Sequence, residues 1–214
     1  MSTTHINREA VERRLSRLRS AYGDVSVLER EETNSTERFD ELQSRGEDGY
    51  TGGGYAWIVR DPEDAPELSG SIPTDAREER SHVLLIVDRG DESGNRWSLP
   101  GGGREGDETY ERATVREVRE ETGLEIGLES PFLIYRVRHV PEDGRDRCLH
   151  TLWVSFDATY EGGSVQLQTG ELRGAAWFPT PPPTLGPWAL YRAVDWWDVD
   201  PDDPWWNAAE IREP

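Results

Sequence analysis

The chain has 214 residues, 34 % of them hydrophobic, which is enough for one sizeable domain with additions. Its formal net charge is −19, and all 24 basic residues are arginine, a composition that favours a protein from a salt-loving organism over an ordinary acidic cytosolic protein. So strong a negative charge argues against general binding to DNA, RNA or an anionic membrane.

The N-terminal part is predicted to contain two helices. Apolar residues recur at helical spacing within residues 5–22. They are Ile6, Ala10, Val11, Leu15 and Leu18. A second, shorter helix is expected to begin near Ser35 or Thr36 and to run through Phe39 and Leu42.

A glycine-rich stretch separates these helices from the rest of the chain. The residues EDGYTGGG, 47–54, are predicted to form a flexible joint. We therefore expect residues 1–47 to be a short helical N-terminal extension that packs on the main domain. Residues 48–214 are then the main domain, with a C-terminal helix and an acidic tail.

Apolar runs bounded by turn residues predict the strands of the main domain. They are residues 54–60, 82–90, 96–100, 131–140, 149–160 and 174–178. The polar residues 61–80 read as a surface loop. Helices are expected at 108–122, closed by Gly123, and at 188–197. Strands on both sides of a central helix predict the α/β class, with a mixed sheet covered by helices.

The central helix carries a cluster of acidic residues. Glu117, Glu120 and Glu121 share one face because they are three and four residues apart. Val115, Val118 and Thr122 lie on a different side, so we expect the carboxylate face to be separate from the packed face.

Three carboxylates on one helical stripe repel each other unless a positive charge lies among them. A hard divalent cation with oxygen ligands, Mg²⁺ or Mn²⁺, meets this need and leaves room for substrate phosphates. The glycines before the helix let the backbone approach closely, so a carbonyl such as that of Gly101 or Gly102 is expected to complete the metal shell.

The spacing around these glutamates is more specific than acidity alone. It reads Gly, five residues, Glu, seven residues, Arg-Glu, an aliphatic residue, any residue, Glu-Glu, any residue, Gly and an aliphatic residue. The matching positions are Gly102, Glu108, Arg116, Glu117, Val118, Glu120, Glu121, Gly123 and Leu124. This pattern resembles the box of the Nudix hydrolase family. The resemblance implies an α/β/α sandwich with a mixed sheet, and it leaves the N-terminal extension outside.

The resemblance implies hydrolysis of a nucleoside diphosphate linked to another moiety, with Mg²⁺ or Mn²⁺ as cofactor. ADP-ribose or another nucleotide sugar, and a nucleoside triphosphate, stay open as substrates. The alternative is a non-catalytic Nudix-like module that senses nucleotides and regulates a partner.

The family roles carry over to this chain position by position. Glu117 and Glu121 are implied as metal ligands, with Glu120 close behind, and Glu117 or Glu120 is implied to orient or deprotonate the attacking water. Arg116 and Glu108 are implied to hold the shape of the loop and helix by pairing. The remaining box residues, Gly102 and Gly123, have structural roles.

Three residues outside the box are candidates for a part in the reaction. Glu171 is a candidate helper carboxylate, although a solvated loop acid explains it equally well. Arg136 and Arg138 are candidates for gripping phosphate, and the alternative is that they pair with surplus carboxylates.

The remaining features predict little chemistry. The four histidines show no metal-ligand spacing, and Cys148, the one cysteine, reads as a packed thiol. No apolar run is long enough to span a bilayer, so we expect a cytoplasmic protein. Two readings stay open for the Trp-rich C-terminal end: packing of the last helix, or a homodimer contact.

Overall fold

The computed structural model describes residues 3–64, 80–89, 96–168 and 170–200. Its elements are β1 (Thr4–His5), α1 (Arg8–Tyr22), β2 (Val27–Asn34), α2 (Thr36–Glu47), β3 (Gly52–Arg60), a 3₁₀ turn (Pro62–Asp64), β4 (His82–Asp88), β5 (Gly101–Gly103), α3 (Tyr110–Thr122), β6 (Leu124–Pro141), β7 (Arg147–Gly163), β8 (Leu172–Phe178) and α4 (Pro187–Trp197). Most of the loop expected at 61–80 lies outside these residues. None of the helices in the described ranges has the length and hydrophobicity that a membrane crossing requires.

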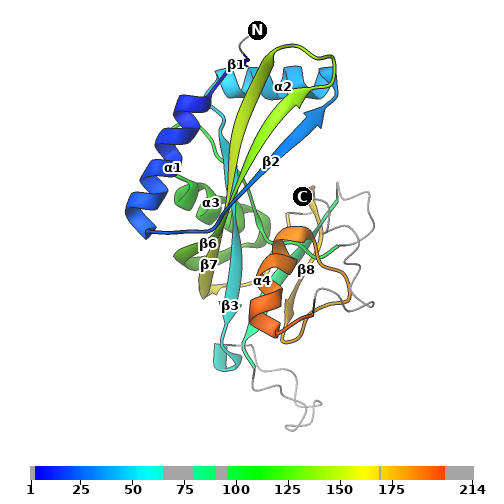
Figure 1. The fold of residues 1–214 in the computed structure, drawn as a ribbon. Helices are drawn as coiled ribbons and strands as arrows, with labels where there is room; N and C mark the ends of the chain where they lie inside the picture. The colour runs from blue at the N-terminus through cyan, green and yellow to red at the C-terminus, as the bar shows by residue number, and fades with distance from the viewer. Residues whose placement is uncertain (1–2, 65–79, 90–95, 169, 201–214) are drawn as a thin grey trace. The chain divides into compact units, whose positions relative to one another are not determined.

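The strands form a mixed sheet. Within the described residues its order is β2-β6-β7-β3-β4-β8, with β1 paired to β7 and β5 paired to β3. The β2–β6 and β1–β7 pairs are parallel, whereas β3–β4 and β4–β8 are antiparallel. The mixed sheet with helices confirms the predicted α/β class (Figure 1).

The chain divides into two compact units. The first unit comprises Met1–Tyr55, Gly102–Thr114 and Ser130–Phe156, and the second unit comprises Ala56–Gly101, Val115–Glu129 and Asp157–Pro214. The strands β3, β5, β6 and β7 and the helix α3 therefore contribute residues to both units. The boundary expected between residues 47 and 48 stays a prediction.

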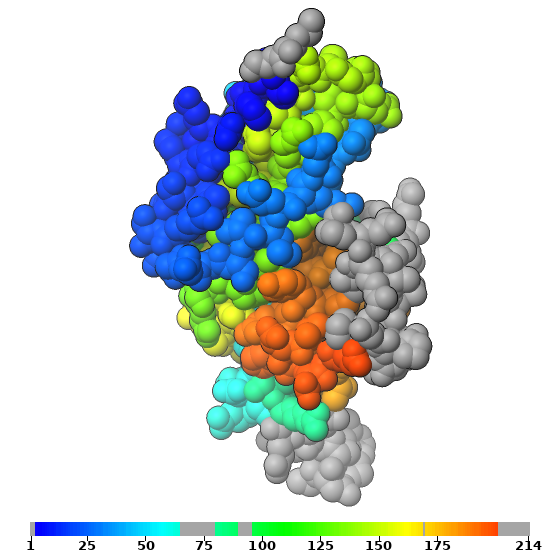
Figure 2. Space-filling model, viewed as in Figure 1, coloured from blue at the N-terminus to red at the C-terminus, as the bar shows by residue number. Residues whose placement is uncertain are grey.

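The N-terminal segment contains both predicted helices. On α1, Val11, Leu15 and Leu18 are buried, as their spacing predicts. On α2, the Ser35 side chain accepts a hydrogen bond from the Arg38 N–H at the N-cap. In the first unit these segments lie against residues of β6 and β7 (Figures 1 and 2).

The segment also contains a strand that its polar sequence does not predict. In β2, VLEREETN, most residues are exposed. Its parallel register with β6 places Glu29 opposite Arg136 and Glu31 opposite Arg138. Both pairs form ion pairs, so cross-strand charge pairing supports a strand that lacks an apolar face.

The glycines 52–54 belong to β3, so the prediction of a flexible joint there is wrong. These glycines lie where backbones approach closely. A Cβ atom on Gly53 would come within 1.9 Å of the Gly102 carbonyl oxygen. A Cβ atom on Gly54 would come within 2.1 Å of Thr114 Oγ1. Glycine is needed here for close packing of a strand rather than for mobility.

The core of the second unit explains how α3 is held. Val118 packs in one apolar cluster with Ile58, Leu84 and Leu124, from β3, β4 and β6. The helix ends as predicted at Gly123, whose φ of 74° and N–H bond to the Arg119 carbonyl form a C-cap.

Candidate catalytic site on α3

The three carboxylates of α3 do not share one environment. Glu121 is only 7 % exposed, and it lies on the buried side of the helix together with Val118 and Thr122. The Glu120 side chain, in contrast, is 54 % exposed. The expected separation of carboxylate face and packed face is therefore wrong for Glu121. Val115, expected in the core, is 37 % exposed instead.

Glu121 is fixed to the glycine-rich strand before the helix. The Gly101 N–H donates a hydrogen bond of 2.8 Å to Glu121 Oε2. Gly101 has a backbone φ of 139°, a conformation that residues other than glycine rarely adopt. The structure thus connects Gly101 to the carboxylate through its N–H, whereas its carbonyl is the group that the sequence predicts as a metal ligand.

Arg116 holds the other two glutamates. Its Nη1 donates to Glu117 Oε1 at 2.9 Å and to Glu120 Oε2 at 3.1 Å. Both partners lie on α3 itself, so these ion pairs do not connect the helix to the loop before it, and the expected role of Arg116 in holding the shape of the loop and helix stays a prediction.

The electrostatic environment of Glu121 is unusual for a carboxylate. Burial, followed by the negative charges of Glu117, Glu171 and Asp88, raises its pKa to about 8, against the lowering effect of the Gly101 N–H. Glu121 is therefore protonated at neutral pH unless a cation is bound nearby. Because perturbed carboxylates gather at functional sites, this group marks a candidate site.

Two of these negative charges come from the end of β4 and from the residue directly before β8. Antiparallel pairing of β4 with β8 places Asp88 opposite Leu172, directly after Glu171. The segment before β8 also lies along α3, because the Gln168 N–H donates to the Glu121 carbonyl at 3.0 Å. Gln168 Nε2 donates to Glu171 Oε1 at 3.1 Å, which holds that carboxylate.

The donor set of this site fits a hard divalent cation. It offers carboxylate oxygens from Glu117, Glu121, Asp88 and Glu171, which Mg²⁺ and Mn²⁺ prefer. A bound cation would remove the mutual repulsion that raises the pKa of Glu121. Among the described residues, however, no three of these carboxylate oxygens lie close enough together to bind one ion. The one group of three ligand atoms that does converge there belongs to other residues.

The loop between β5 and α3 belongs to the first unit and depends on a buried arginine. Arg104, 4 % exposed, donates to Thr51 Oγ1 at 3.1 Å and to the carbonyl oxygens of Gly49 and Gly106. Glu108 closes the same loop, because its Oε2 accepts a hydrogen bond from the Glu105 N–H.

Replacing Arg104 by methionine is expected to lower the free energy of unfolding by about 3 kcal/mol, because buried oxygens lose a charged donor. Urea denaturation followed by tryptophan fluorescence measures this. Arg112 is exposed on α3, so Arg112→Met should change the same quantity by less than about 0.5 kcal/mol. Equal stability of the two variants would contradict a structural role for Arg104.

The candidate phosphate arginines lie in the first unit on β6. Arg136 pairs with Glu12 at 2.6 Å and with Glu29 at 3.3 Å. Arg138 Nε donates to Glu31 at 2.9 Å. Both therefore have carboxylate partners, as in the alternative to phosphate binding that the acidic composition suggests.

Sequence reasoning missed Asp88 and Arg104. Asp88 ends a buried strand, and only its pairing with β8 connects it to Glu171 and Glu121. Arg104 follows the glycines directly, a position from which its burial is not evident. Trp205 and Trp206 of the expected Trp-rich end lie outside the described residues.

Comparison with known proteins gives matches at both the family and the protein level. A family model described as NUDIX domain matches residues 70–193, more than half of the 214-residue chain. A protein of Pectobacterium atrosepticum named NAD-capped RNA hydrolase NudC is 31 % identical over 99 residues, which cover 46 % of this chain and 35 % of that protein. The chain thus spans about a third of the length of the curated relatives that it matches.

Solved structures are similar at lower identity. A UDP-X diphosphatase is 18 % identical, with a TM-score of 0.41, and the match covers 83 % of this chain and 71 % of that chain. An ADP-ribose pyrophosphatase from Streptococcus suis is 17 % identical, with a TM-score of 0.36, and the match covers 62 % of this chain and 78 % of that chain.

Proposed function

Since the chain belongs to the NUDIX domain family, we propose that it is a metal-dependent hydrolase of a nucleoside diphosphate linked to another moiety. The observation that carries this proposal is the buried Glu121 carboxyl, hydrogen-bonded to Gly101 and subject to the negative charges of three other carboxylates. Ionising such a buried carboxyl costs free energy when no cation is near. When a cation is present, the ionised carboxylate can bind it.

We assign roles to the α3 residues on this basis. Glu117 and Glu121 bind Mg²⁺ or Mn²⁺, with Glu120 and a backbone oxygen of Gly101 as further ligand candidates. When bound, the ion neutralises charge on the diphosphate oxygens and lowers the pKa of a bound water. Arg116 positions the carboxylates of Glu117 and Glu120 through its two ion pairs.

The remaining roles concern the attacking water and the shape of the loop. A carboxylate, Glu117 or Glu120, accepts the proton of the attacking water, and Glu171 is a second candidate from the segment before β8. Gly102 and Gly123 fix the backbone at the two ends of the box, and Glu108 holds the loop between them.

The substrate is proposed to be a small nucleotide rather than an RNA. The net charge of −19 opposes the approach of a long polyanion, whereas a diphosphate is small enough to be neutralised by the bound ion. ADP-ribose, another nucleotide sugar and a nucleoside triphosphate are the proposed classes. The name of the NudC relatives adds NAD as a compound to be tested.

The test is a turnover assay in high salt with Mg²⁺ or Mn²⁺, on ADP-ribose, a nucleotide sugar, a nucleoside triphosphate and NAD. Cleavage of one class in the diphosphate bridge, dependent on the ion, supports the proposal. Saturable binding of a nucleotide without any product supports the alternative of a nucleotide-sensing module and contradicts hydrolysis.

We also propose a homodimer contact through α4. Tyr191 and Trp196 of this helix are 39 % and 37 % exposed, although Trp196 and Trp197 also pack on Trp57. Sedimentation velocity of the wild type and of Tyr191→Ser tests this, and a monomer at all concentrations contradicts it.

A further inference from the structure

Three side chains that the proposed hydrolysis does not use converge in the first unit. Cys148 Sγ lies 2.9 Å from His5 Nδ1 and 3.7 Å from His150 Nε2, and the two ring nitrogens are 2.9 Å apart. Among the described residues, this is the one group of three whose ligand atoms all lie within 4.8 Å of one another. We propose that His5, Cys148 and His150 form a binding site for a transition-metal ion of the zinc class.

The backbone brings the three residues together before any ion binds. Parallel pairing of β1 with β7 places His5 opposite Cys148. The Thr4 N–H donates to the Asp146 carbonyl at 2.8 Å, and the Ile6 N–H donates to the Cys148 carbonyl at 3.0 Å, so His5 lies between two ladder bonds.

A buried asparagine fixes the third ligand. The Asn7 amide donates to the His150 carbonyl at 2.8 Å, and Asn7 Oδ1 accepts from the His150 N–H at 2.8 Å. Because Cys148 and His150 are two residues apart on β7, both side chains point to the same face. The site is therefore preorganised by two strands.

The donor atoms match zinc and not magnesium. Two imidazole nitrogens and one thiolate suit a borderline-soft ion, whereas Mg²⁺ requires oxygen ligands. Bonds of about 2.0 Å to nitrogen and 2.3 Å to sulfur in a tetrahedron separate the ligand atoms by roughly 3.3–3.6 Å. The observed separations of 2.9–3.7 Å reach this geometry with small side-chain shifts.

Burial affects the two inner ligands in opposite ways, and the site therefore rests on its geometry. Burial, with smaller effects of nearby arginines and His5, lowers the pKa of His150 to about 4, so its imidazole is neutral at pH 7. Burial raises the pKa of the Cys148 thiol, so metal binding must release the thiol proton.

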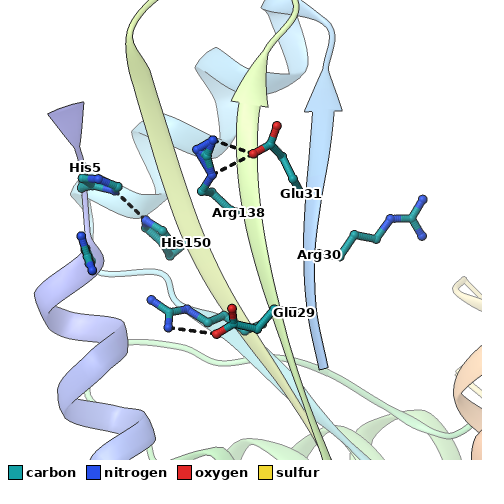
Figure 3. A pocket seen from close by; sticks show the side chains of 8 residues that line it. His5, Glu29, Arg30, Glu31, Arg138 and His150 are labelled. Carbon is teal, nitrogen blue, oxygen red and sulfur yellow. Dashed lines mark hydrogen bonds and ion pairs between the residues drawn. The ribbon is translucent and has the colours of Figure 1, made fainter. Parts of the chain in front are cut away.

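The site opens on one side to a cavity of about 400 Å³. His5 and His150 line this cavity and point toward each other, and Arg138 beside them pairs with Glu31 (Figure 3). Arg136 is likewise paired with Glu29, but Arg8 and Arg30 also line the cavity, so four arginines face two glutamates and the excess positive charge favours an anion beside a bound metal ion. Three protein ligands leave a fourth tetrahedral position, which faces the cavity and takes water or a small anion.

The test uses Co²⁺ as a spectroscopic probe on the full chain, reduced and freed of metal by chelation. With excess Mg²⁺ present to occupy the carboxylates of α3, we expect one tightly bound Co²⁺ per chain, the intense visible bands of tetrahedral cobalt, and a near-ultraviolet thiolate-to-cobalt absorption that equimolar Zn²⁺ removes. Because Cys148 is the one cysteine, a thiolate band has a single source. Without that band, or with binding of copper but not of Co²⁺ and Zn²⁺, the proposal is overturned.

Variants identify the ligands. His5 is exposed, so His5→Gln should fold normally and weaken Co²⁺ binding at least about tenfold. Cys148→Ser should abolish the thiolate band, and His82→Gln, the control, should leave spectrum and affinity unchanged. Unchanged cobalt spectra in His5→Gln or Cys148→Ser would show that the three groups form only a hydrogen-bonded cluster. The readout needs no turnover, so it is independent of the proposed hydrolysis.

Discussion

Glu121→Gln is expected to reduce turnover by a factor of about 100 or more while the protein stays folded. A glutamine loses the negative charge that would hold the cation, but its Oε1 still accepts the hydrogen bond from the Gly101 N–H. Initial rates against Mg²⁺ concentration, on whichever substrate the panel identifies, measure the effect. The loss should appear in kcat and in the metal requirement, because the missing group binds the ion rather than the nucleotide.

Glu117→Gln should behave in the same way, since it removes the second proposed ligand. Glu129 is an exposed acid of β6 in the same unit, so Glu129→Gln removes the same charge away from α3 and should keep wild-type rates. If Glu117→Gln and Glu121→Gln are both fully active, the assignment of the site to α3 is wrong. If all three variants lose activity alike, general charge and not the site is responsible.

The sequence predicts the parts of this fold that local patterns control. Periodicity of Val11, Leu15 and Leu18 locates α1, and Gly123 marks the end of α3 within one residue. The local sequence does not predict β2, because this strand is supported by ion pairs with Arg136 and Arg138, which lie about a hundred residues later in the chain.

The same distinction between local patterns and long-range contacts applies to the candidate site. The spacing of the box identifies Glu117, Glu120 and Glu121 as a group, but it cannot show that Glu121 alone is buried. That burial depends on contacts with Gly101 and with the charges of Asp88 and Glu171, which the β4–β8 pairing supplies. The His5, Cys148 and His150 cluster is missed for the same reason, since β1 and β7 meet only in the folded chain.

Stability of the metal-free protein is expected to fall as the pH rises toward 8, and Glu121→Gln should remove this fall. The folded-state pKa of Glu121 is raised from 4.5 to about 8, so between these values the folded chain holds a proton that the unfolded chain has lost. The stability that this proton contributes is complete below pH 4.5 and is lost progressively up to pH 8.

Two histidines change stability in the opposite direction at lower pH. The pKa values of His139 and His150 are lowered to about 4, so the unfolded chain binds protons there that the folded chain does not, and stability rises between pH 4 and 6.5. The effect of Glu121 is therefore isolated above pH 6.5. From pH 6.5 to pH 8 the free energy of unfolding of the wild type should fall by about 2 kcal/mol relative to that of Glu121→Gln.

Urea denaturation in a chelator, at several pH values and constant high salt, measures this difference. Glu129→Gln should follow the wild-type curve, because its carboxylate is exposed. Added Mg²⁺ should flatten the wild-type curve, since a cation favours the ionised carboxyl, and it should have little effect on Glu121→Gln. Parallel curves for wild type and Glu121→Gln between pH 6.5 and 8 would show that Glu121 is already ionised in the metal-free chain. The buried, cation-requiring carboxyl on which the proposed function rests would then be absent.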